Sequence, residues 1–296
     1  MHDLSAFPGT PPAEDDVYEV WSMCYSARMP RRVRDNFVRP GDLHDGPMPA
    51  DFNLWILRNA HRVVLVDTGF GARASAERDR PLDFDPIDGL KRIGIDPDEL
   101  DDIVITHLHY DHAGNIDRFA RARFHVQDGE VAFATGRCMC DGHIRLPYDV
   151  EDVVALVRRT YADRVVFHDG DDALLPGITL HAYPGHSAMV QAVRVMTERG
   201  PVVLASDTTH YFANILNMNQ FVVTVDVEAT LDSYRRILEL AGGVDRLVPG
   251  HDPKIRRLYP AVRVNGVELL ALHKQPNPVP AEELARTDDF AEAPAD

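Results

Sequence analysis

The sequence predicts a layered α/β fold in which two mixed β-sheets are flanked by helices. Three observations support this prediction. The chain has 296 residues, of which 45% are hydrophobic, and this is enough for a large core in one α/β domain. It contains ten short β-branched runs typical of strands. Only three clear amphipathic helical patterns lie between them, so a strict alternation of strands and helices is not expected.

The predicted elements follow from these patterns in chain order. Strands are expected at 17–23, 53–57, 63–66, 103–106, 123–126, 165–168, 178–182, 193–197, 202–205 and 246–248. Helices are expected at 86–93, 151–161 and 228–241, where apolar residues recur near i, i+3 and i+4. The longest apolar runs have the length of a strand, whereas a membrane helix needs about 20 residues. No membrane partner is therefore expected.

The charge pattern divides the chain into one domain and two terminal segments. Residues 1–16 and 276–296 are rich in proline, alanine and acids, and they carry nine of the 16 net negative charges. We expect a flexible N-terminal arm, a single domain at 17–275 and an acidic flexible tail. Residues 29–52 contain several prolines and are expected to form a lid or a homodimer contact. The acidic balance argues against nucleic acid as a partner.

The cysteines give little functional signal. Cys24, Cys138 and Cys140 are an odd count without a framework of pairs, and no signal-peptide pattern opens the chain. A cytoplasmic location is therefore expected. One residue separates Cys138 from Cys140, which is tighter than the usual zinc spacing, so both are expected to be ordinary loop thiols.

Residues that can bind a metal ion cluster where the strand predicted at 103–106 ends. The four ligand-type residues His107, His109, Asp111 and His112 follow it within six positions. Alternate residues at a strand end face the same side, so His107 and His109 share one side, and a turn would bring Asp111 and His112 to a neighbouring point. This strand end can therefore serve two metal ions about 3.5–4 Å apart. Imidazole and carboxylate donors favour zinc, or less often Fe, Mn or Co.

Further candidate ligands follow three other predicted strands. Zinc takes about four ligands, so the cluster at 107–112 is incomplete by itself. His186 stands in a Gly-His-Ser turn, Asp207 follows Ser206, and His251 stands in Pro-Gly-His-Asp. Taken together with the cluster at 107–112, these positions predict a dinuclear site built from several strand ends.

The ordered motifs HxHxDH, GHS, SD and PGHD, preceded by Val66-Asp67-Thr68-Gly69, resemble the metallo-β-lactamase superfamily over about residues 50–255. The resemblance implies an αββα sandwich and two zinc ions, with Asp67 beside the site. It implies that Asp207 bridges the ions, that one ion is held by His107, His109 and His186, and that the other is held by Asp111, His112 and His251. A hydroxide shared by the two ions would then attack an ester or lactone carbonyl, with Asp111 helping to handle the proton.

Segments 48–55, 64–71 and 94–100 resemble the N-acyl homoserine lactonase branch of this superfamily. The resemblance implies a lactonase that opens an N-acyl homoserine lactone or a similar lactone or ester. The alternative is a glyoxalase-II-like thioesterase, or a phosphodiesterase, that uses the same site.

One position departs from this branch. Lactonases of this group have a tyrosine three positions after the bridging aspartate, where this chain has His210 followed by Tyr211. Either side chain can donate a hydrogen bond to the substrate carbonyl, and His210 is favoured by position. Neighbouring residues on a strand point in opposite directions, so one of the two is expected to do so. The apolar residues that follow are candidates for an acyl-chain groove, with a core role as the alternative; they are Phe212, Leu216, Met218 and Phe221.

Overall fold

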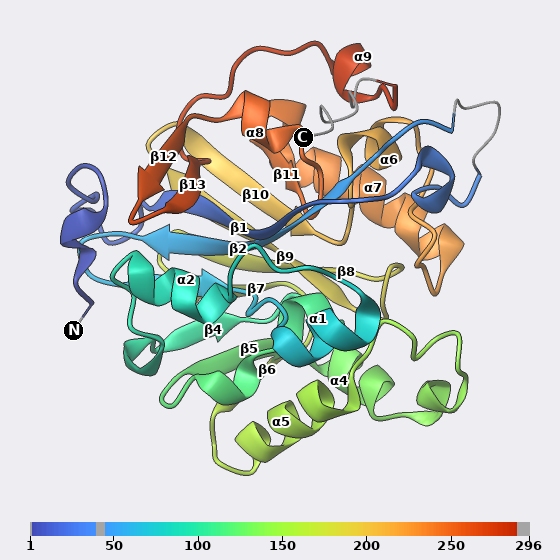
Figure 1. Cartoon of the computed structure of the whole chain (residues 1–296), viewed down its shortest axis with the longest axis horizontal. Helices are drawn as coiled ribbons and strands as arrows, with labels where there is room; N and C mark the ends of the chain where they lie inside the picture. The colour runs from blue at the N-terminus through green and yellow to red at the C-terminus, as the bar shows by residue number, and fades with distance from the viewer. Residues whose placement is uncertain (1, 40–44, 289–296) are drawn as a thin grey trace.

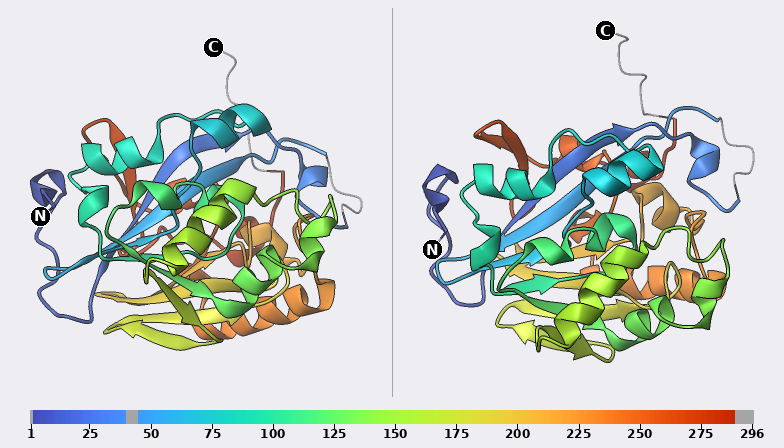
Figure 2. Two further views of the ribbon diagram at one scale, coloured as in Figure 1. Left: turned by 90° about the horizontal axis from the view of Figure 1, so that it is seen from below. Right: turned by 60° about the horizontal axis from the view of Figure 1, so that its bottom comes forward.

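The computed structural model describes residues 2–39 and 45–288, which form two β-sheets packed face to face with helices on both outer faces (Figures 1 and 2). The first sheet has the spatial order β12 (Ala261–Val264), β13 (Val267–Ala271), β1 (Glu19–Met29), β2 (Ala50–Arg58), β3 (Val63–Val66), β4 (Asp102–Val104), β5 (Arg123–Gln127) and β6 (Val165–His168). The second sheet has the order β11 (Leu247–Pro249), β10 (Gly200–Ser206), β9 (Val190–Thr197), β8 (Ile178–Tyr183) and β7 (Asp172–Leu175). Both sheets are mixed, because β3 to β6 are parallel in the first and β10 and β11 are parallel in the second. The predicted fold class is confirmed.

The helices are short, apart from two. They are α1 (Ala72–Arg78), α2 (Pro86–Arg92), α3 (Tyr110–Ala113), α4 (Asp128–Ala134), α5 (Val150–Thr160), α6 (Phe212–Leu216), α7 (Val227–Ala241), α8 (Ile255–Leu258) and α9 (Ala281–Leu284). The three predicted helices are confirmed as α2, α5 and α7, and each begins at an aspartate whose side chain accepts a hydrogen bond from the first helical turn. Across the described residues, helices are too short or too polar to cross a bilayer.

Three buried clusters fill the three interfaces between these layers. Strand β10 shows how one strand serves two of them. Val202 and Leu204 pack between the sheets, against residues of β2 and β3. Val203 and Ala205 point to the opposite face and pack under α7, against Tyr234 and Ile237. From Val202 to Ala205 this strand is buried on both faces, so it is a continuous apolar run.

Each of the ten predicted strands overlaps an observed strand, and three further strands were not predicted. Strands β12 and β13 form a hairpin whose two turn residues, Asn265 and Gly266, both have positive φ (46° and 84°). Asn-Gly between apolar runs is the strongest short-range hairpin signal, so the sequence did contain the information. Strand β7 lies at a sheet edge and begins with two exposed residues, which leaves no apolar alternation to detect.

The terminal segments differ from the expectation of solvated arms where they are described. Phe7 is 5% exposed and packs edge-on against Trp21, with their ring centroids 5.9 Å apart. In the C-terminal segment, Leu284 of α9 is buried, and Lys254 Nζ donates to the carbonyl oxygens of Leu284 (2.9 Å) and Arg286 (2.6 Å). Phe7 anchors the N-terminal segment and Leu284 anchors the C-terminal segment. The average composition of each segment does not reveal such a single buried side chain. Residues 1 and 289–296 lie outside the described residues.

Candidate active site

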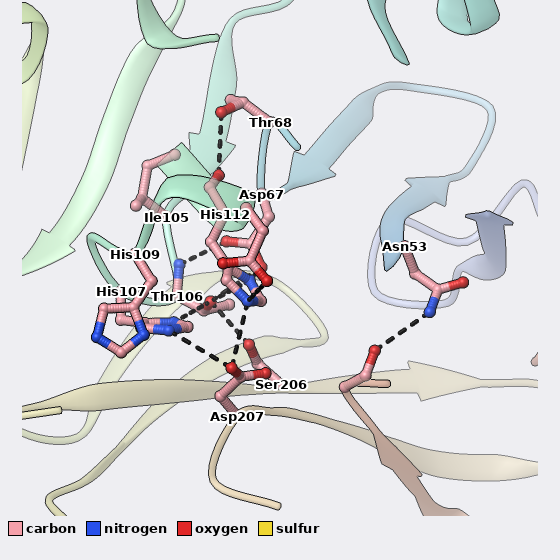
Figure 3. A network of polar contacts seen from close by, with 12 residues as sticks. Asn53, Asp67, Thr68, Ile105, Thr106, His107, His109, His112, Ser206 and Asp207 are labelled. Atoms are coloured by element: carbon pink, nitrogen blue, oxygen red, sulfur yellow. Dashed lines mark hydrogen bonds and ion pairs between the residues drawn. The ribbon is translucent and has the colours of Figure 1, made fainter. Parts of the chain in front are cut away.

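The seven predicted ligand residues meet at one edge of the sandwich, where four strands end. Figure 3 shows His107, His109, His112 and Asp207 of this set. Strands β8 and β10 run in the same direction because each pairs antiparallel with β9, and β11 runs parallel to β10. Their carboxyl ends therefore lie at the same edge, and each is followed by one ligand-type side chain. The loop after β4 and the helix α3 that follows it reach the same point from the first sheet. They carry the remaining four residues, which are His107, His109, Asp111 and His112.

Two groups of ligand atoms lie around Asp207. His107, His109, His186 and Asp207 form one group, and Asp111, His112 and His251 form the other; within each, all ligand atoms lie within 4.8 Å of one another. A third group with the same spacing, Asp207, His210 and His251, overlaps them. Asp207 Oδ2 lies 3.2 Å from His186 Nε2 and 3.4 Å from His112 Nε2. Asp207 Oδ1 lies 2.9 Å from His251 Nε2. The structure thus brings the residues together in the division that the resemblance implies.

These donors suit a pair of divalent metal ions. His107 Nε2 and His112 Nε2 are buried, and no hydrogen-bond partner is found for them among the described residues. His186 Nε2 and His109 Nδ1 face each other at 2.9 Å. Buried polar atoms are nearly always satisfied, so unsatisfied imidazole nitrogens that converge on a carboxylate are typical of residues that bind a metal ion. Five imidazoles and two carboxylates match the preferences of zinc.

The electrostatics differ among the proposed ligands. Burial alone would lower the pKa of His112 and His251, but the neighbouring Asp207 and Asp111 outweigh it and raise both pKa values above the ordinary histidine value. Burial lowers the pKa of His107 and His109 well below the ordinary histidine value, so both imidazoles are neutral. Burial alone would raise the pKa of Asp207, but the facing His251 and His112 outweigh it and hold this pKa well below its ordinary value. Neutral nitrogens and an anionic oxygen are the forms that coordinate a cation.

Asp67 lies directly behind the ligands, as the resemblance implies. One carboxylate oxygen is 2.7 Å from His112 Nδ1, and the carboxylate also accepts hydrogen bonds from the backbone N–H and hydroxyl of Thr106 (Figure 3). Asp67 thereby fixes the orientation of the His112 ring, so that Nε2 faces the site. The Thr106 hydroxyl lies 2.8 Å from that of Ser206, which links the end of β10 to the loop after β4.

Glu130 of α4 is a supporting residue that the sequence analysis did not identify. It is fully buried, and its carboxylate accepts hydrogen bonds from the backbone N–H of Leu108 (3.0 Å) and of Met189 (3.2 Å). The Tyr148 hydroxyl donates a third, at 3.1 Å. Glu130 therefore joins the loop that carries His109 to the loop that carries His186. No local pattern marks it, because its burial arises only from tertiary packing.

Two glycines of the ligand motifs are required by the space around them. A Cβ atom at Gly250 would lie 2.6 Å from Asp207 Oδ1, which is closer than real contacts allow. The Gly250 carbonyl also accepts a hydrogen bond from Asn53 Nδ2 at 3.1 Å (Figure 3). Gly185 has a φ of 135°, and a Cβ there would meet the backbone of Thr230 at 2.5 Å. These positions explain why glycine precedes both His251 and His186.

His210 and Tyr211 both line the cavity, contrary to the expectation that only one would face it. The expectation assumed a strand, but β10 ends at Ser206 and the chain turns before α6. The His210 ring stacks on Phe221 with centroids 3.6 Å apart, and its Nε2 is 3.1 Å from Asp207. Burial lowers the pKa of His210 to about 3, so the ring is neutral. Within the described residues, no hydrogen-bond partner is found for His210 Nδ1 or Tyr211 Oη.

The cavity above the cluster has a volume of about 550 Å³. Its walls come from separate segments and include Arg31, Phe52, Tyr110, Leu146 and Phe221. Of the four candidates for an acyl-chain groove, only Phe221 lines it; the other three pack in the core clusters. Segment 29–52 contributes several wall residues, so its role as a lid or dimer contact stays a prediction. Residues 40–44 of that segment lie outside the described residues.

The two cysteines considered as possible metal ligands do not take part in this site. Cys138 and Cys140 are free thiols in a short 3-10 helix, Arg137–Cys140, and they belong to none of the metal-binding groups found among the described residues.

Comparison with known proteins identifies the family. The model of the metallo-β-lactamase superfamily matches residues 53–251. An N-acyl homoserine lactonase from Bacillus thuringiensis is 30% identical over 247 residues, covering 75% of this chain and 89% of the relative. A second, from a Bacillus species, is 27% identical over 223 residues, covering 69% and 80%. A solved quorum-quenching N-acyl homoserine lactone lactonase aligns with a TM-score of 0.65 and 25% identity, covering 81% of this chain and 95% of that one. The chain is therefore a member of the metallo-β-lactamase superfamily.

Proposed function

We propose that this protein is a dinuclear zinc lactonase that opens the ring of an N-acyl homoserine lactone or a similar lactone. The observation that carries the proposal is the convergence of five histidines and two aspartates under a cavity of about 550 Å³. The similarity to N-acyl homoserine lactonases supports a lactone as the substrate. Other members of this fold hydrolyse thioesters or phosphodiesters. We assign the two metal positions to the two groups described above, with Asp207 shared between them.

A pair of divalent ions, when bound, supplies a water activated at neutral pH and polarises the substrate carbonyl. The side chains of the protein then bind and orient the lactone. His210 and Tyr211 line the cavity, and among the described residues no hydrogen-bond partner is found for His210 Nδ1 or Tyr211 Oη. We assign to these two side chains the hydrogen bonds to the ring oxygens. Asp111, whose carboxylate faces the cavity beside His251, takes part in moving the proton. The aromatic walls exclude water from the acyl chain.

A substrate panel tests this proposal. Zinc-loaded protein would be assayed with N-acyl homoserine lactones, simple lactones, thioesters and bis-p-nitrophenyl phosphate. The proposal predicts that lactones give the highest kcat/KM. It is wrong if thioesters or the phosphodiester are hydrolysed while the lactones remain intact.

A further inference from the structure

Three arginines stand at the solvent side of the cavity in a chain whose net charge is −16. Arg31, Arg78 and Arg80 line the cavity and keep part of their surface exposed, whereas the metal-site residues below them are buried. We call these three residues the cationic rim. One carboxylate, that of Glu77, lines the same exposed part of the cavity. The mouth is therefore locally positive although the whole molecule is strongly acidic.

The guanidinium groups of Arg31 and Arg78 are held in place by neutral partners. The guanidinium of Arg31 stacks over the Phe221 ring, 4.8 Å from its centroid, and Nε donates to Asn36 Oδ1 at 2.6 Å. Arg78 stacks over Tyr110 at 4.2 Å and donates to the carbonyl oxygens of Leu146 (2.8 Å) and Tyr148 (2.9 Å). Aromatic faces, amides and carbonyls fix the planes of these groups without cancelling their charge.

The rim also lacks neutralising ion pairs. In residues 2–39 and 45–288, no ion pair within 4.0 Å joins Arg31, Arg78 or Arg80 to a carboxylate, whereas Arg73, one turn before Glu77, pairs with three acids. The rim comes from two segments far apart in the sequence, because Arg31 packs on the cavity residue Phe221 and Arg78 packs on the cavity residue Tyr110. Fixed, uncompensated guanidinium groups that line one cavity form a binding site for an anion, and a carboxylate is their best geometric match.

We propose that the cationic rim selects lactones whose acyl part ends in a carboxylate. This inference rests on the proposed lactonase function and names the substrate class. The lactone ring would occupy the base of the cavity beside His210 and Tyr211. The acyl chain would pass between the aromatic walls, and its terminal carboxylate would meet the guanidinium groups at the mouth.

A matched pair of substrates tests the proposal. N-hexanoyl and N-adipoyl homoserine lactone have the same acyl length, and only the second ends in a carboxylate. We expect zinc-loaded protein to favour the adipoyl lactone in kcat/KM by about tenfold at 20 mM salt, and this preference to shrink at 0.5 M salt because the rim charges are screened. Arg31→Gln and Arg80→Gln should each reduce the ratio of the two kcat/KM values about fivefold. Arg158→Gln, an exposed arginine of α5, is the control and should leave the ratio unchanged.

The outcomes separate this inference from the proposed function. The inference is wrong if, at low salt, kcat/KM for the hexanoyl lactone equals or exceeds that for the adipoyl lactone. It is also wrong if Arg31→Gln and Arg80→Gln both leave the ratio of the two kcat/KM values unchanged. If neither lactone is opened, the proposed function fails. In that case, calorimetry measures the affinity of the protein for the same two compounds. Tighter binding of the adipoyl compound supports anion binding by the cationic rim, and equal affinities contradict it.

Discussion

Asp67 has two roles: it adopts an uncommon backbone conformation, and its side chain contacts a proposed metal ligand. Its φ of 64° lies in the left-handed region, which aspartate and asparagine accept more readily than most residues. Asp67→Asn therefore keeps the backbone and removes the negative charge beside His112 Nδ1. We expect the affinity for zinc to fall about 10- to 100-fold, measured by competition with a chromogenic chelator. Asp128→Asn, at an exposed position, is the control; equal affinities for both variants and the wild type would show that Asp67 does not orient His112.

His273 predicts a pH dependence of stability away from the metal site. It is 4% exposed, and burial lowers its pKa to about 4 from an ordinary value of 6.5. Because the folded pKa is below the unfolded one, the unfolded chain binds the proton first. Stability is therefore lost as the pH falls from about 6.5 to about 4, by up to about 1.4 kcal/mol per pH unit from this residue.

His273→Gln removes this titration. Urea unfolding at pH 7 and at pH 5 should show that the wild type loses more free energy of unfolding than the variant does. The comparison is made with a chelator present, so that metal binding does not contribute. Equal losses in the two proteins would contradict the assignment.

At the scale of elements, the site depends on strand ends that can be predicted from the sequence. It also depends on tertiary contacts that cannot be predicted from it. The strands could be predicted because β-branched runs such as 63–66 and 202–205 fill the two sheet interfaces. The ligand loops could be predicted because His186, Asp207 and His251 each directly follow such a run. Glu130 could not be predicted, since a glutamate in the first turn of a helix is usually exposed and only the packing of α4 under both loops buries it.

Glu130→Gln tests this link between the two loops. An amide can accept the hydrogen bond from one backbone N–H, but its own NH₂ group then faces the other donors. We expect the free energy of unfolding of the metal-free protein to fall by about 2 kcal/mol, measured by urea unfolding. The zinc affinity should fall too, because both ligand loops lose an anchor. Glu239→Gln, an exposed substitution on α7, should change neither quantity; a Glu130 variant that behaves like it would refute the linking role.

On the scale of the whole molecule, the acidic charge says little about the substrate. Much of it lies in the terminal segments, while the cavity mouth is lined by Arg31, Arg78 and Arg80. The meeting of the seven proposed donors could be predicted, because each of them belongs to a short sequence motif. The cavity walls could not, because Arg31, Phe52, Leu146 and Phe221 become neighbours only when four distant segments pack around the same strand ends.

The central claim is that a pair of zinc ions held by the seven-residue cluster drives lactone opening. The most direct measurement is to titrate metal-free protein with zinc while following the ring opening of N-hexanoyl homoserine lactone. The account predicts no activity without metal and a plateau at about two ions per chain. His109→Ala should bind less zinc and stay inactive. Ring opening that needs no metal, or a plateau at one ion per chain, would contradict the account.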